Sequence, residues 1–355
     1  SSESPFAHLV AALKRCGFDG VELLAGPPGS PPARTQARRV EPRVFAVRTI
    51  AKATVLLGQY VESLGTPSKQ PYYQLKLQRV LHDLVTVCAE GAWKHVGVVN
   101  NKPGEKYVFE HGVNVAVIAL VVGARIGLRR SRLAELGMAA LLRDIGKALL
   151  PGGLIHKSGR FTTEEREELK RSPAHGVRAI LQEGQYNEAL LRRILVVCEH
   201  RDPDEGARHP FSELIGLAER LDALMSPRRY RTALLPDDAM RAIAGLAEFD
   251  ADFRRALLWS LGLYPSGTFV ELASGAIAVS FHPNFNPSCL RTPVVRILRD
   301  AEGRECPKAP VLDLARSSDR IVRCLPPSAV GGGAPRFLAK PVEPGAAAQA
   351  APSSP

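Results

Sequence analysis

Residues 107–262 show helical patterning almost throughout, and this stretch constrains the fold of the 355-residue chain more than any other feature. Apolar residues recur in it at the three- and four-residue spacing that places them on one face of a helix. Glycine- and proline-rich positions, which end helices, interrupt it at intervals. These breaks are at Gly127, Pro151 to Gly153, Gly184 and residues 203–210. The pattern predicts a set of packed helices of ordinary length.

The segments on either side of this stretch differ from it. In residues 33–104 the apolar residues again have helical spacing, with a break at Gly65-Thr66-Pro67, so we expect two helices there. Beyond Gly262, short β-branched and aromatic runs alternate with Gly, Pro and Asn, which predicts a small antiparallel sheet. The runs cover residues 267–272, 276–281 and 294–298. We therefore expect a mainly α fold with an N-terminal helical region and a small C-terminal β subdomain.

Both ends of the chain have low-complexity composition. A Pro/Gly-rich linker at residues 26–32 cannot hold regular structure, and the tail after Pro326 is rich in Gly, Ala, Pro and Ser. We predict that the tail is disordered. The domain limits predicted from these changes in pattern are residues 1–32, 33–104, 105–262, 263–325 and 326–355.

Composition limits the class of protein. The six cysteines have no CxxC spacing, which favours reduced thiols in a cytoplasmic protein. The longest apolar runs, such as residues 113–124, are shorter than the ~20 residues that span a bilayer, so we expect no membrane association. The net charge of +11 comes largely from arginines spread along the chain. This does not favour nucleic-acid binding, although it suits a small anionic ligand such as a phosphodiester.

The pentapeptide Arg143-Asp144-Ile145-Gly146-Lys147 is the most informative motif. It follows an apolar helical run, residues 136–142, that would present it. A His-Asp pair at this place would offer a divalent metal one imidazole and one carboxylate from adjacent residues. Arginine stays protonated at any working pH and has no lone pair for a metal. The motif therefore looks like a metallohydrolase signature whose first ligand has been replaced.

A series of further fragments occurs in a fixed order around this motif. They are His111-Gly112-Val113-Asn114-Val115-Ala116, Arg143 to Lys147, Lys170 to Gly176, Glu199-His200-Arg201-Asp202, Arg208-His209-Pro210, Glu219 to Leu224 and Arg228-Arg229-Tyr230-Arg231. The series resembles the HD-GYP family, a branch of the HD superfamily of metal-dependent phosphohydrolases that hydrolyse the bacterial second messenger cyclic di-GMP. The likeness covers roughly residues 105–325. It implies an HD-type helical bundle over residues 105–262.

This sequence departs from the family pattern at several ligand positions. The family pattern has histidine where Arg143, Ser172 and Arg201 stand here, and aspartate where Glu219 stands. The resemblance leaves a residual metal-ligand set of His111, Asp144, His200 and Glu219. Asp144 and Lys147 keep inherited catalytic positions. The resemblance thus implies a degenerate member with an incomplete ligand set.

The replacements change the charge of the site as well as its ligands. A two- or three-metal centre needs about six to eight ligand groups, and three imidazoles are missing. Arg143 and Arg201 also place fixed positive charges where a divalent cation would lie. We therefore expect no cofactor, or Fe, Mn or Zn if the site is active. The two arginines have two alternative uses: to pair with Asp144 and Glu219 in a metal-free network, or to face outward and, with Lys147, bind a phosphate.

Three functional hypotheses follow. The first is a degenerate HD-GYP protein without hydrolase activity that works as a binding or interaction module in signalling. The second is an active cyclic di-GMP phosphodiesterase with a reduced metal site, and the third is a metal-free receptor for a cyclic dinucleotide. The partners expected are a cyclic dinucleotide or other phosphate ligand and a signalling protein.

Several other residues have simpler interpretations. His175 lies one helical turn from Ser172 and offers an alternative imidazole, although the side chain would need a shifted backbone to reach the same ion. His209 is interpreted as an exposed loop residue. Trp93 and Trp259 are both predicted to be core residues.

Overall fold

The computed structural model describes residues 41–66, 68–98, 107–150, 154, 161–184, 186–200, 208–226, 232–284, 286–331 and 337–338. All of them belong to one unit, Glu41–Pro355. The predicted N-terminal segment and linker, Arg201, the cluster at residues 228–231 and most of the predicted disordered tail lie outside the described residues.

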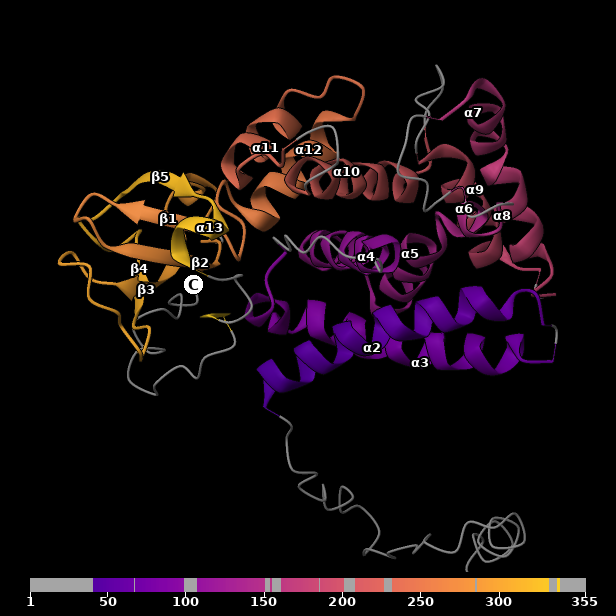
Figure 1. Cartoon of the computed structure of the whole chain (residues 1–355), viewed down its shortest axis with the longest axis horizontal. Coiled ribbons are helices and arrows are strands. Elements are labelled where there is room, and N and C mark those ends of the chain that lie inside the picture. Colours follow the sequence, from indigo (N-terminus) through magenta and orange to yellow (C-terminus); the bar gives the residue numbers. More distant parts are fainter. Residues whose placement is uncertain are drawn as a thin grey trace, which may run out of the picture. The chain divides into compact units, whose positions relative to one another are not determined.

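The described residues form mainly helices, followed by a small sheet (Figure 1). The prediction of a mainly α fold with a C-terminal β subdomain is therefore confirmed. The helices are α2 (Pro42–Ser63), α3 (Gln70–Ala89), η1 (Ala92–His95), α4 (Tyr107–Arg125), α5 (Arg130–Leu142), α6 (Ile145–Ala148), α7 (Thr163–Lys170), α8 (Ser172–Leu181), α9 (Glu188–Glu199), α10 (Pro210–Met225), α11 (Pro236–Ala244), α12 (Ala251–Leu261), η3 (Pro287–Cys289) and α13 (Pro327–Val330).

Helices α2 and α3 are the two helices expected near the N-terminus, and they lie side by side (Figure 1). Each begins with a proline in its first turn, where the missing N–H costs no helical hydrogen bond. Within the described chain, α2 is long and apolar enough to cross a membrane, and 39% of its most apolar part is buried inside the structure. This is weak evidence for a membrane span, because core helices of soluble proteins can be equally long and apolar. Helix α2 packs on α3 and α4.

Helix α4 forms the centre of the helical core. Residues 115–122 are at most 5% exposed, so this helix is apolar on all sides rather than on one face. It contacts α2, α3, α5, α10 and α12. Burial on every side fixes the direction in which α4 presents the polar residues near its N-terminal end.

Helix α6 approaches α8 more closely than side chains would permit. A Cβ atom added to Gly146 would lie 1.8 Å from the carbonyl oxygen of Ser172 and 2.6 Å from the backbone nitrogen of Gly176. The motif of residues 143–147 is therefore held against the first turn of α8 by direct backbone contact.

Gly146→Ala is expected to lower the free energy of unfolding by about 3 kcal/mol, because the clash is with backbone atoms that cannot rotate away. Urea denaturation followed by circular dichroism would measure the loss. Gly65→Ala is the matched control, since a Cβ atom there would meet nothing within 4 Å. Equal losses in the two variants would contradict the close contact.

The C-terminal sheet is antiparallel, with strand order β4-β3-β2-β1-β5. Alternate residues pack into two separate clusters, one containing Phe269, Val279 and Phe281 and the other containing Val270 and Ala278. Both faces are therefore covered. The strands are β1 (Phe269–Leu272), β2 (Ile277–His282), β3 (Val294–Arg299), β4 (Val311–Asp313) and β5 (Ile321–Leu325).

One prediction about the core is wrong. Trp93 is buried as expected, but Trp259 is 46% exposed. Helix α12 buries Leu257, Ser260 and Leu261, and Trp259 lies between these positions on a more exposed face. On a helix with one buried and one exposed face, the residue type alone does not show whether a tryptophan lies in the core.

Candidate metal-type site

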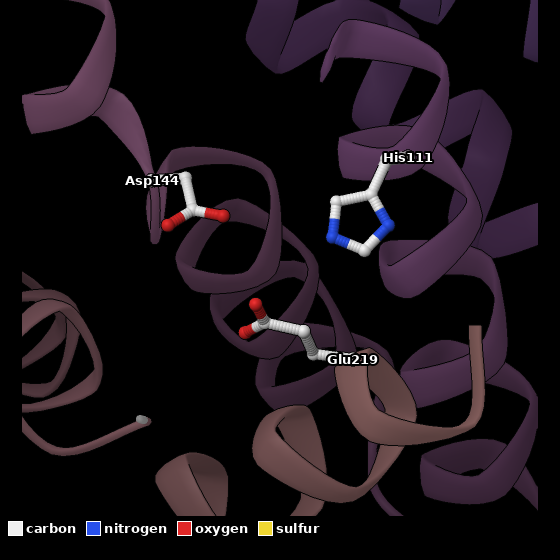
Figure 2. Close-up of side chains that lie close together, drawn as sticks. All are labelled: His111, Asp144 and Glu219. Carbon is white, nitrogen blue, oxygen red and sulfur yellow. The ribbon is translucent and has the colours of Figure 1, made fainter. Parts of the chain in front are cut away.

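Three segments that are distant in the sequence bring three of the predicted site residues together. His111 comes from α4, Asp144 from the junction of α5 and α6, and Glu219 from α10. Ligand atoms of these three side chains all lie within 4.8 Å of one another, and Figure 2 shows them pointing toward a common space. Each offers an imidazole nitrogen or a carboxylate oxygen, so these are the residues that could hold a metal ion.

His111 is oriented by a buried carboxylate. Its Nδ1 lies 2.5 Å from Oδ2 of Asp222, and the amide of Asn114 donates a hydrogen bond to the other oxygen of Asp222. Asp222 is only 3% exposed. With Nδ1 engaged by Asp222, Nε2 is the imidazole nitrogen left for the site, which is the arrangement that orients histidine ligands in metal centres.

Asp222 and Asn114 are functional residues that sequence reasoning missed. The available signal was spacing: Glu219 and Asp222 are three residues apart on α10, and His111 and Asn114 are three apart on α4. Residues at that spacing lie on one helix face, so each pair could have been expected to face the same site.

Arg143 is the feature that sets this site apart from a simple metal centre. Its side chain is 1% exposed, and its Nη1 donates a hydrogen bond of 2.9 Å to the carbonyl of Ala140. Its Nη2 lies 3.5 Å from Oδ2 of Asp144, and its Nε lies 3.5 Å from Oε2 of Glu219. One guanidinium is thus shared between the two carboxylates.

Two more predicted residues complete the cluster. Lys147 forms a salt bridge to Asp144 one helical turn away. His200, at the end of α9, donates from Nδ1 to the carbonyl of Val196 at 2.7 Å, so Nε2 faces the site. That Nε2 lies 3.5 Å from both Oδ1 of Asp144 and Oε2 of Glu219.

The remaining candidates lie elsewhere. Arg201 is outside the described residues. The hydroxyl of Ser172 donates to the carbonyl of Leu169, and His175 forms an ion pair with Glu168 at 3.4 Å on the surface side of α8. The structure therefore gives His175 a partner outside the metal-type site, so it does not replace the imidazole missing at Ser172.

His209 is a half-buried capping residue rather than an exposed loop residue. Its Nδ1 accepts a hydrogen bond from the backbone nitrogen of Phe211 and so caps α10. Partial burial lowers the pKa of His209 below its usual range, against the opposing effect of Glu199. His209 therefore helps to fix the start of the helix that carries Glu219.

Comparison with known proteins identifies this architecture. The family model described as an HD domain matches residues 99–252. The chain is 29% identical over 257 residues to the cyclic di-GMP phosphodiesterase PA4108 of Pseudomonas aeruginosa, covering 68% of this chain and 61% of that protein. It is 28% identical over 133 residues to the cyclic di-GMP phosphodiesterase response regulator RpfG of Xanthomonas campestris, covering 35% of each. Residues 99–252 thus match the HD domain family and are similar to the HD domains of cyclic di-GMP phosphodiesterases.

The HD-GYP relatives are longer than their matching segments. This chain spans 61% of the length of PA4108 and 42% of the 3'3'-cGAMP-specific phosphodiesterase 1 of Vibrio cholerae, to which it is 23% identical over 197 residues. A solved structure of the HDG"Y"P protein Bd1817 from Bdellovibrio bacteriovorus overlaps 62% of this chain and 73% of its own, with a TM-score of 0.49 and 15% identity.

Proposed function

We propose that this HD-GYP domain does not hydrolyse cyclic dinucleotides and instead acts as a metal-free binding or interaction module in signalling. The observation that supports it is the position of Arg143. A fully buried guanidinium lies 3.5 Å from each of Asp144 and Glu219, two of the three residues that could hold a metal. HD-family hydrolysis depends on a divalent metal, so the charge in this site decides the activity.

The residues present do not fit a divalent ion. Asp144 is paired with both Arg143 and Lys147, and Glu219 shares Arg143. An ion among these ligand atoms would lie roughly 4 Å from the guanidinium. At an effective dielectric near 20, a +1/+2 pair at that distance repels by about 8 kcal/mol. A repulsion of that order offsets the attraction of one carboxylate at the same distance, and Lys147 offsets part of the other.

The Arg143 network also accounts for how the site remains folded without an ion. Two partly buried carboxylates side by side would repel each other if nothing positive lay between them. One guanidinium and one ammonium supply two positive charges next to Asp144 and Glu219. The network therefore replaces the cohesive role of a metal with side chains of the same chain.

A second candidate function is favoured by one observation. His111, Asp144 and Glu219 still place ligand atoms within 4.8 Å of one another, and Nε2 of His200 lies 3.5 Å from both carboxylates. These four residues could hold a single ion if Arg143 moved aside. That ion would supply Lewis-acid chemistry, and the chain would be a reduced phosphodiesterase.

The relatives named as cyclic di-GMP phosphodiesterases suggest a cyclic dinucleotide as the ligand class. A direct grip on its phosphates by Arg143 is not supported, because this side chain is 1% exposed and faces two carboxylates. Lys147 also faces Asp144. The receptor hypothesis therefore depends on binding groups other than these two.

The test is to purify the chain without chelator and to measure metal content and cyclic di-GMP turnover together. We expect far less than one Fe, Mn or Zn ion per chain and no linear product when Mn²⁺ or Fe²⁺ is supplied. PA4108, treated in parallel, is the positive control. Near-stoichiometric metal with product release would establish the second candidate instead. Saturable cyclic di-GMP binding in EDTA would identify the module as a receptor.

A further inference from the structure

Helices α8 and α9 form an apolar groove on the surface. The groove has a volume of about 810 Å³ and is lined from α8 by Ala174, Val177, Arg178 and Leu181 and from α9 by Cys198. The α8 residues recur at spacings of three and four, so they form one stripe along that helix. A folded domain normally buries such a stripe, and here both helices already bury their opposite faces in the core.

Exposed apolar side chains occur in this groove and on α9. Leu181 is 38% exposed and Tyr186, which also lines the groove, is 76% exposed. On α9, Leu191 and Leu195 are exposed and lie on the same helix face as Cys198, at spacings of seven and three residues. A gathered apolar patch of this kind is typical of a surface that is covered by another protein.

The charge of the groove indicates what covers it. The acids next to the lining residues are already engaged within the chain: Glu183 pairs with Arg193, and Glu199 accepts a hydrogen bond from the backbone nitrogen of His209. In the described part of the chain, Arg178 has no salt bridge, and it projects from the apolar stripe of α8. The surface that complements this groove is therefore apolar with an added negative charge.

We propose that the α8–α9 groove binds an amphipathic helix of a partner protein that carries a carboxylate within its apolar face. The apolar stripes of α8 and α9 would receive the side chains at positions i, i+3, i+4 and i+7 of that helix. The carboxylate would pair with Arg178. This inference names the kind of partner for the proposed interaction role. It rests on the proposed function only in assuming that the domain works through a partner protein.

A second copy of this chain fits the groove less well. An isologous dimer through this patch would bring two copies of Arg178 into one interface, and Glu183 and Glu199 next to the groove are already engaged within the chain. Two desolvated guanidinium groups without a new acid oppose association. Charge complementarity therefore favours a partner of different sequence.

The groove is connected to the metal-type site through the same two helices. The first turn of α8 is in backbone contact with Gly146, two residues from Asp144. Helix α9 ends at Glu199, and the next residue, His200, has its Nε2 3.5 Å from Asp144 and Glu219. A partner helix bound across α8 and α9 would therefore contact two helices that lead directly to residues of the metal-type site.

The experiment measures binding of a fluorescent 18-residue peptide to the full chain by anisotropy. The peptide is a designed Leu/Ala helix with one Glu inside its apolar stripe, and a second peptide has Lys in place of that Glu. We expect the Glu peptide to bind wild type at least ~10-fold more tightly than Leu181→Asp. Val47→Asp is the matched control, because Val47 is also an exposed helical residue, at 41%, and should bind like wild type.

Charge reversal locates the contact. Arg178→Glu should exchange the preference, so that the Lys peptide binds more tightly than the Glu peptide. The bound Glu peptide should also protect Cys198, the exposed cysteine of the groove, from alkylation in wild type. Protection is measured by peptide mapping, with Cys306 as the internal reference.

Three results would overturn the proposal. They are no binding of the Glu peptide to wild type, an unchanged preference in Arg178→Glu, and self-association of wild type that Leu181→Asp abolishes, which would assign the groove to a second copy. None of these results depends on metal content or turnover, so failure here is distinguishable from failure of the proposed function.

Discussion

Replacing Arg143 with methionine is expected to lower the free energy of unfolding by about 3–5 kcal/mol. The guanidinium is fully buried and is shared by Asp144 and Glu219 at 3.5 Å each. Methionine fills a similar volume but leaves two neighbouring carboxylates without that positive charge. Removing one partner of a buried ionic group costs far more than the group contributes net, since the remaining charges stay desolvated. Chemical denaturation with a two-state fit measures the difference.

The control for Arg143→Met is the same substitution at Arg255. Arg255 forms an ion pair with Asp252 on α12, but its side chain is 61% exposed, and exposed pairs contribute about 0–1 kcal/mol. Adding Glu219→Gln to Arg143→Met should recover part of the loss, because it removes one of the two carboxylates that Arg143 neutralised. If Arg143→Met is no more destabilising than Arg255→Met, the guanidinium is not the centre of a buried network.

The helical part of the fold could be predicted because its signals are local. Proline and glycine positions divide the helices, and Thr162, which precedes Glu165 by three residues, forms a capping box with it at the start of α7. Two strands of the sheet, β4 and β5, were not anticipated. They have three and five residues, and much of each is partly or fully exposed. Their place in the sheet comes from pairing with β3 and β1 rather than from an apolar pattern of their own.

The site was predictable in membership but not in arrangement. Motif order was sufficient to name His111, Asp144, His200 and Glu219 as neighbours. It left open whether Arg143 faces outward to a phosphate or inward to carboxylates, because both uses suit the same residue type. The direction depends on the packing of α4, α6 and α10 around it, which no local pattern contains. The role of Asp222 likewise becomes visible only once α4 and α10 are adjacent.

Replacing Arg143 with histidine is expected to convert the site into one that binds metal. The substitution removes the positive charge that opposes a divalent ion by about 8 kcal/mol and supplies one more imidazole beside His111, Asp144 and Glu219. We expect elemental analysis of protein purified without chelator to show close to one Mn, Fe or Zn ion per Arg143→His chain. Wild type should hold a small fraction of that amount.

Arg143→Met separates the effect of losing the positive charge from the effect of gaining an imidazole ligand. It removes the charge without adding a ligand, so it should bind metal more weakly than Arg143→His but more strongly than wild type. Added Mn²⁺ should then raise the melting temperature of Arg143→His and leave that of wild type unchanged, since an ion that binds only the folded state stabilises it. Turnover of cyclic di-GMP should stay absent in Arg143→His. Serine still stands at position 172, where the family pattern has a histidine, and its hydroxyl donates a hydrogen bond to the carbonyl of Leu169. Equal metal content in wild type and Arg143→His would mean that the guanidinium does not exclude the ion.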